Sequence, residues 1–188
     1  MGNSLKKIAK KASAYDYILL IMRHAKTEPS NDRGDFQREL TEKGLKQAKI
    51  VAKGLIAMDL VPDSISCSGA VRTQQTLKKM LKRFGDKPDV VTRQSLYEEG
   101  MGAVIDEIAQ VKDSHHIAMI IGHEPTLSIS SQWLANQDSD SDVLDSLNLG
   151  LSNGTVVLFG SQKPFSQWQT HDAELLAVLT PKDFEHDL

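Results

Sequence analysis

The sequence predicts an α/β protein, a three-layer α/β/α sandwich with a mostly parallel central sheet. Two mostly aliphatic runs, residues 17–22 and 117–121, are uninterrupted, as expected of strands buried on both faces of a parallel sheet. Segments with apolar residues at helical spacing alternate with short runs suited to strands. Alternation of this kind is typical of a sheet covered by helices on both faces.

The first half of the chain supplies two of the expected helices. Residues 28–39 follow the first strand and are polar with Pro and Gly, so we expect a loop. Thr41 is a candidate N-cap for a helix whose apolar residues repeat as far as Leu55. A turn at Pro62 precedes a short strand over 64–67 and a second helix that continues through residue 81.

The second half repeats the alternation. A weak strand at 90–91 precedes a helix over 101–111, and the second aliphatic strand precedes a helix from about 126 to 134. Pro125 suits the first turn of that helix. The acidic, Ser-rich segment 137–148 is expected to be a mobile edge loop, and two further strands lie near 155–159 and 175–179.

Length and composition favour one domain. With 188 residues and no internal repeat or linker, we expect a basic extension at 1–15 and a single domain at 16–188. The extension has apolar residues on one helical face, typical of a docked or frayed surface helix; binding to an anionic membrane is the less favoured alternative.

The same numbers exclude several classes of partner. A net charge of -3 indicates no nucleic-acid footprint, and no apolar run approaches the roughly 20 residues that span a bilayer. The single cysteine, Cys67, fits a reducing compartment. We therefore expect a cytoplasmic protein with no membrane contact.

Charged side chains follow three of the expected strands. Arg23 and His24 end the first, Arg72 lies in the first turn of the helix after the second, and His123 follows the second aliphatic strand. Because parallel strands end at the same edge of a sheet, these side chains should converge on one crevice. Two arginines and two histidines near helix N-termini favour a dianionic phosphoryl group, and we expect phosphate or sulfate to bind there.

Four motifs carry a resemblance to a known family. They are Leu20-Ile21-Met22-Arg23-His24-Ala25, residues 38–44 (Arg-Glu-Leu-Thr-Glu-Lys-Gly), residues 68–76, and Ile121-Gly122-His123-Glu124-Pro125. Over roughly residues 17–181 the chain resembles the histidine phosphatase superfamily, in particular its SixA-type phosphohistidine phosphatase branch. The resemblance implies a phosphoglycerate mutase-like catalytic domain over 16–188.

The resemblance also implies roles for the four residues. His24 corresponds to the nucleophile, and Arg23, Arg72 and His123 correspond to the groups that bind the phosphoryl oxygens. A neutral imidazole can attack phosphorus and form a phosphohistidine that water then hydrolyses. No metal and no cofactor is required for this scheme.

The leaving group separates the possible substrates. A phosphate ester leaves as an alkoxide and needs a general acid, for which Glu98, Glu99, Glu28 and Asp35 are candidates. Imidazole has a reference pKa near 6.5 and leaves more readily than an alkoxide. The lack of an unambiguous acid favours phosphohistidine on a signalling or phosphotransfer protein.

Two alternatives stay open. One is a phosphatase or mutase acting on a small phosphorylated molecule, although a mutase needs a more enclosed pocket than so short a chain is expected to provide. The other is a non-catalytic phosphate-binding regulatory module. An imidazole aimed at phosphorus argues against the second, because binding alone does not require a nucleophile.

Overall fold

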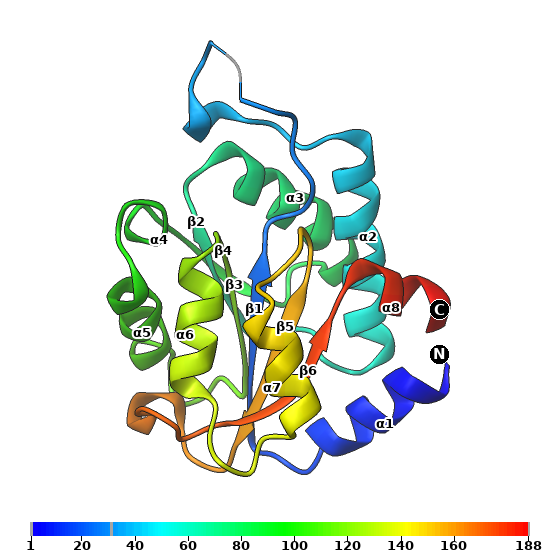
Figure 1. The fold of residues 1–188 in the computed structure, drawn as a ribbon, viewed down its shortest axis with the longest axis vertical. Coiled ribbons are helices and arrows are strands. Elements are labelled where there is room, and N and C mark those ends of the chain that lie inside the picture. Colours follow the sequence, from blue (N-terminus) through cyan, green and yellow to red (C-terminus); the bar gives the residue numbers. More distant parts are fainter. Residues whose placement is uncertain (1, 31, 188) are drawn as a thin grey trace.

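The computed structural model describes residues 2–30 and 32–187, whose strands form one six-stranded sheet between two layers of helices (Figure 1). The strands are β1 (Tyr17–Arg23), β2 (Ser64–Ser68), β3 (Asp89–Arg93), β4 (Ile117–Gly122), β5 (Val156–Ser161) and β6 (Glu174–Leu179). Their order across the sheet is β3-β2-β4-β1-β5-β6.

The predicted sheet is confirmed as mostly parallel. β1, β2, β3 and β4 pair in parallel, while β5 is antiparallel to both of its neighbours. The register sets Arg23 of β1 beside Gly122 of β4. His24 and His123 therefore leave the sheet at the same level of its carboxyl edge, where parallel sheets place their ligand sites.

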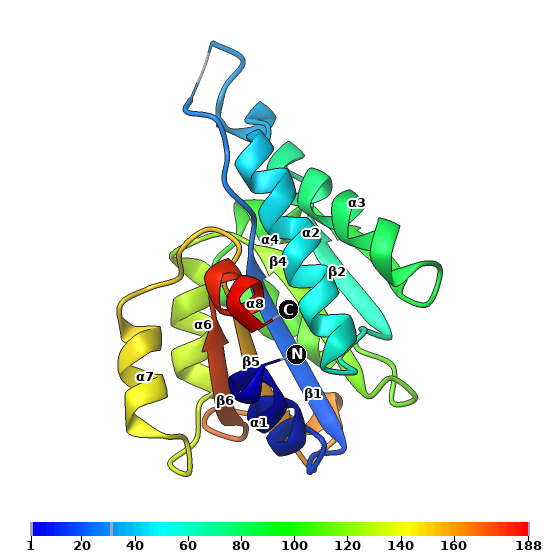
Figure 2. The same ribbon diagram turned by 90° about the vertical axis from the view of Figure 1, so that its right-hand side faces the viewer.

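Helices cover both faces of the sheet. They are α1 (Asn3–Ala12), α2 (Glu42–Ala57), α3 (Val71–Phe84), α4 (Ser95–Glu98), α5 (Met101–Ala109), α6 (Thr126–Leu134), α7 (Ser141–Asn148) and α8 (Pro181–Asp187), with short 3-10 turns at Asp35–Gln37 and Phe165–Gln167. Side chains of β1 alternate between the two layers: Leu20 packs with α1, α2, α3 and α8, and Ile21 packs with α5, α6 and α7. Figure 2 shows α2 and α3 side by side on one face and α7 on the other.

The N-terminal segment is a docked helix rather than a frayed one. Leu5 of α1 is fully buried in the core between α1, α2 and α8. Lys11 forms an ion pair with Glu174 of β6 at 2.7 Å, and the Tyr15 hydroxyl donates to the same carboxylate. Residues 2–15 thus belong to the packed fold, and none of the described helices is long and apolar enough to cross a membrane.

The prediction of a loop over 137–148 is wrong for residues 141–148. Residues Ser141–Asn148 form α7, whose N-cap Asp140 accepts a hydrogen bond from the amide of Asp142 at 2.8 Å. Leu147 is fully buried beneath the acidic surface of the helix. The helix is only eight residues long and acidic, so its few apolar positions did not indicate an amphipathic helix in the sequence. The other predicted elements are present, with ends that differ by a few residues.

Candidate active site

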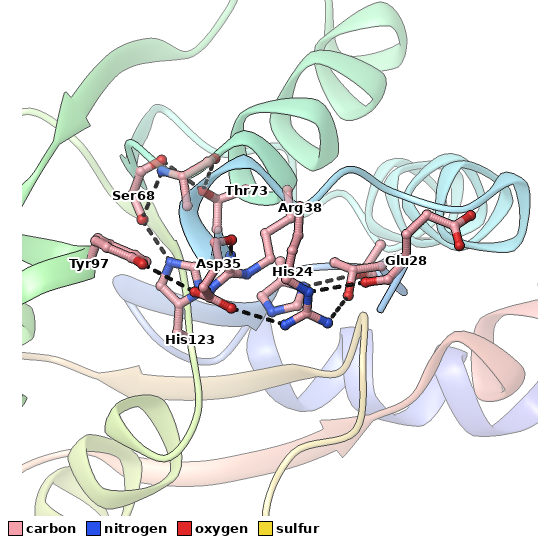
Figure 3. Close-up of polar contacts among 12 residues, drawn as sticks. His24, Glu28, Asp35, Arg38, Ser68, Thr73, Tyr97 and His123 are labelled. Atoms are coloured by element: carbon pink, nitrogen blue, oxygen red, sulfur yellow. Dashed lines mark hydrogen bonds and ion pairs between the residues drawn. The ribbon is translucent and has the colours of Figure 1, made fainter. Parts of the chain in front are cut away.

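The backbone after β1 is fixed from both sides. The amide of His24 donates to the carbonyl of Gly122 in β4 at 3.1 Å, and the amide of Gly154 donates to the carbonyl of His24 at 3.0 Å. Thr76 on α3 accepts from the amide of Ala25 at 3.1 Å. The chain therefore presents the His24 side chain from a rigid position at the sheet edge (Figure 3).

The ring of His24 is held in one tautomer. Its Nδ1 lies 2.8 Å from the carbonyl oxygen of Ala25, and because a carbonyl only accepts, Nδ1 carries the proton. The ring is 5% exposed. Burial, followed by the nearby His123, Arg72 and Arg23, lowers the pKa of His24 to about 3. His24 is thus neutral at physiological pH, with the lone pair on Nε2.

His123 lies directly beside this ring. The two imidazole centroids are 5.4 Å apart, and the edge of Tyr97 packs against His123 at 5.5 Å. Burial, followed by Arg72, lowers the pKa of His123 to about 4. Its Nε2 lies 2.7 Å from the Ser68 hydroxyl oxygen, which also accepts from the amide of Ala70 at 3.4 Å. When the hydroxyl donates to Nε2, Nδ1 of His123 carries the proton.

The two arginines come from different elements. Arg23 donates from Nη1 to the carbonyl of Leu151 at 2.6 Å, and Glu124 holds the same loop by accepting from the amide of Leu151 at 3.3 Å. Arg72 is 5% exposed, and its guanidinium lies 5.8 Å from the centre of the Tyr97 ring.

Three buried nitrogen atoms of this group lack a protein hydrogen-bond partner. They are Nε of Arg23, Nε of Arg72 and Nδ1 of His123, among the described side chains. Buried polar groups are nearly always hydrogen-bonded, so three such nitrogens on residues that interact electrostatically with His24 favour a ligand with several acceptor atoms. The structure thus brings together the four residues that the sequence predicted to converge.

A carboxylate lies over these cations. Asp35 accepts from Nη2 of Arg72 at 2.9 Å, from Nη1 of Arg38 at 3.1 Å and from the Tyr97 hydroxyl at 3.1 Å (Figure 3). Burial alone would raise the pKa of Asp35, but the hydrogen bonds from Arg38 and Arg72 outweigh it and lower the pKa. Asp35 is therefore an anion at neutral pH.

Arg38, Tyr97 and Ser68 were not assigned a role from the sequence. Besides Asp35, Arg38 contacts the carbonyl of Glu28 at 3.0 Å and the Thr27 hydroxyl at 2.6 Å. Arg38 begins the quoted 38–44 motif and Ser68 begins the 68–76 motif, so the motifs were the available signal. Their contacts depend on the path of the loop and on the side chain opposite, which a motif does not give.

Of the four acids considered from sequence, only Asp35 enters the site. Glu98 and Glu99 are exposed, and Glu98 accepts from Gln94 at 3.0 Å. Glu28 is also exposed, and its carboxylate points away from the histidines in Figure 3. In the described ranges, no group of three or more His, Cys, Asp or Glu side chains is placed to hold a metal ion.

A buried, neutral histidine lies beside two arginines and a second histidine, and one nitrogen of each of these three lacks a protein partner. At the carboxyl edge of a doubly wound sheet, this arrangement defines an oxyanion-binding site of the phosphoryl-transfer class. Residues 19–120 match the histidine phosphatase superfamily, branch 1. The chain belongs to this superfamily, and the predicted enzyme class, a phosphatase with a SixA-type fold, is confirmed.

Individual relatives agree with this assignment. The fold is similar to that of a Nakamurella multipartitia protein named after the phosphohistidine phosphatase SixA, with a TM-score of 0.77, 28% identity, and coverage of 88% of this chain and 96% of that one. A protein histidine phosphatase SixA complexed with tungstate shares the fold alone, with a TM-score of 0.72, 15% identity, and coverage of 88% and 98%.

A curated relative is an uncharacterised protein of Mycobacterium tuberculosis, 33% identical over 115 residues, which are 61% of this chain and 70% of that protein. Another, from Mycobacterium leprae, is 25% identical over 167 residues, 86% of this chain and 100% of that protein.

Proposed function

We propose that the chain is a metal-independent phosphatase that removes phosphoryl groups from phosphohistidine on a protein, with His24 as the nucleophile. The observation that carries this proposal is the pinned, neutral imidazole beside three unpaired donor nitrogens. A module that only bound phosphate would gain nothing from a histidine whose Nε2 lone pair is kept free.

In the first step the lone pair of His24 Nε2 attacks phosphorus. A bond forms between Nε2 and phosphorus while the bond from phosphorus to the substrate imidazole breaks. Protonated on its other nitrogen, that imidazole leaves as a neutral group and needs no proton from the protein. Arg23, Arg72 and His123 hold the equatorial oxygens and stabilise their charge during transfer.

In the second step water attacks the phosphorus of phosphorylated His24. The bond to Nε2 breaks, inorganic phosphate is released, and His24 returns to its neutral form with the proton still on Nδ1. The hydrogen bond to the Ala25 carbonyl supports both steps, because it holds the ring orientation and the tautomer throughout the cycle.

The choice of substrate rests on the acids. An ester would need a proton donor near the leaving oxygen, yet Glu28, Glu98 and Glu99 are exposed and Asp35 is ionised. A phosphohistidine substrate requires no such donor. The Nakamurella multipartitia relative, 28% identical, is named after the phosphohistidine phosphatase SixA, which supports the same substrate class. A role in cytoplasmic phosphotransfer signalling is part of this proposal.

The experiment compares free phosphohistidine, phosphoserine and para-nitrophenyl phosphate as substrates at equal concentrations. We expect the highest kcat/KM for phosphohistidine and a phosphoenzyme that is labile in acid and stable in base. The His24→Asn variant is the control and should form none. Equal turnover of alkyl phosphates would instead favour the small-ester alternative, and binding of phosphate without turnover would favour the regulatory module.

A further inference from the structure

The surface charge of the molecule is strongly segregated. Helices α2 and α3 contain nine of the 22 Lys and Arg residues of the chain but only one of its 25 Asp and Glu residues. These two helices therefore carry a charge of +8 in a chain whose net charge is -3, or +7 without Arg72, which is buried in the candidate active site. The net charge of the whole chain conceals this strongly basic face.

Five of these cations line one groove between α2 and α3. The groove has two connected parts of about 410 and 310 Å³, which share Leu45 and Lys79. We call it the lysine groove; its basic residues are Lys46, Lys49, Lys78, Lys79 and Lys82, which outnumber the two acidic residues that also line it, Glu39 and Glu42. Among the described residues, none of the five lysines takes part in an ion pair.

The lysine groove begins beside the candidate active site. Its near end is lined by Leu40 and Gln75, and Gln75 accepts from the amide of Leu40 at 2.7 Å. The neighbouring Thr76 holds the amide of Ala25, next to the nucleophile, and Arg72 lies one turn earlier on α3. A chain segment whose modified side chain entered the site could extend directly into the groove.

We propose that the lysine groove docks an acidic stretch of the phosphoprotein substrate, beside its phosphohistidine. This inference rests on the proposed function. Exposed lysines give modest binding energy individually, but several on one face steer an acidic partner and fix its orientation. The acidic α7 lies on the opposite face of the sheet (Figure 2) and repels an acidic partner. The basic face and the acidic face therefore both favour the approach of that partner from the side of α2 and α3.

A substrate series tests the proposal. Two synthetic peptides carry one phosphohistidine each, flanked by Asp and Glu in one and by Ser and Gly in the other, and free phosphohistidine is the third substrate. At low salt we expect kcat/KM for the acidic peptide to exceed that for the neutral peptide about ten-fold. That ratio should fall toward one at high salt, because salt screens exposed charges.

Two matched variants locate the effect. The groove variant carries Lys46→Gln, Lys49→Gln, Lys79→Gln and Lys82→Gln. The control variant carries Lys6→Gln, Lys7→Gln, Lys10→Gln and Lys182→Gln. It loses the same number of positive charges, but from α1 and α8. We expect the peptide ratio to fall to about one in the groove variant and to persist in the control, with free phosphohistidine turned over equally by both.

Other results would overturn the docking proposal. It fails if the groove variant retains the ratio, or if the control variant loses it equally. It also fails if the wild type shows no preference between peptides and instead binds phosphatidylserine vesicles or RNA through the same lysines. If no phosphohistidine substrate is turned over, the proposed function fails, and the docking proposal is then decided by anisotropy of a fluorescent unphosphorylated acidic peptide.

Discussion

The inner half of the site, Arg23, His24, Arg72 and His123, is carried by the sheet and by α3. The outer half, Asp35, Arg38 and Tyr97, is carried by loop residues and by α4, and Asp35 joins the two halves through its hydrogen bonds to Arg72. His24 is 5% exposed, and its ring Nδ1, its amide and its carbonyl are each hydrogen-bonded to main-chain groups. The Asp35 side chain is 47% exposed and belongs to a loop that projects beyond the sheet edge (Figure 1). The buried inner half suits a reaction that needs fixed geometry. The exposed outer half suits a contact to Arg72 that an incoming or departing anion can replace.

Removing the proposed nucleophile should have the largest effect. We expect His24→Asn to lower kcat by at least about 1,000-fold, on the scale of other nucleophile deletions, while phosphate binding is largely kept. Single-turnover kinetics and trapping of the phosphoenzyme measure the loss in turnover, and titration with inorganic phosphate measures binding. Residual covalent phosphate on the variant would assign the nucleophile elsewhere.

The next comparison sets one arginine of each half against the other. Arg72→Gln removes a buried donor from the phosphoryl group, and we expect about a 100-fold loss in kcat/KM. Arg38→Gln removes an outer contact to Asp35 and should cost no more than about ten-fold. Steady-state kinetics with free phosphohistidine provide the test. Equal losses would show that both halves bind the transition state.

A third prediction concerns how the outer loop is attached. A Cβ at Gly44 would lie 2.1 Å from the carbonyl oxygen of Lys26, which accepts from the amide of Thr41, so backbone must move. We expect Gly44→Ala to destabilise the fold by roughly 1–3 kcal/mol and to reduce activity. Gly102→Ala, which meets nothing within 4 Å on α5, should stabilise by about 0.5 kcal/mol. Denaturant unfolding measures the free energy of unfolding of both variants. Similar values for the two would refute the close approach of Gly44 to the carbonyl of Lys26.

The pH dependence of stability should also separate the halves. The folded pKa of His24 is about 3 against 6.5, so between these values the unfolded chain binds the proton first. The contribution of neutral His24 to the free energy of unfolding is therefore fully present above pH 6.5. It decreases as the pH drops, by at most about 1.4 kcal/mol per pH unit. The lowered pKa of Asp35 makes the free energy of unfolding depend on pH only below about pH 3.8, the ordinary pKa of this carboxyl.

Denaturant unfolding of variants between pH 7 and pH 4.5 tests this separation. The slope of the unfolding free energy should be smaller in His24→Asn and unchanged in Asp35→Asn. An altered slope in Asp35→Asn alone would mean that the outer carboxylate titrates in the range assigned to the inner histidines.

The sequence was sufficient for the inner half and insufficient for the outer one. Arg23 ends a buried parallel strand, His24 and His123 directly follow such strands, and Arg72 lies in the first turn of the helix after another. Sheet topology alone therefore brings them together. Asp35 was a candidate acid, but its charged state is set by Arg38 and Arg72, whose contacts depend on the path of the loop. The same limit applies to α7, where acidic residues concealed an apolar side.

Asp35 gives the cationic floor of the site a counter-ion of its own. In the proposed cycle, once inorganic phosphate leaves Arg72, a tethered carboxylate at high effective concentration can take the same guanidinium at once. The departing anion need not leave a bare charge behind for water to solvate. We therefore expect weak product inhibition, provided by a side chain that the reaction never consumes.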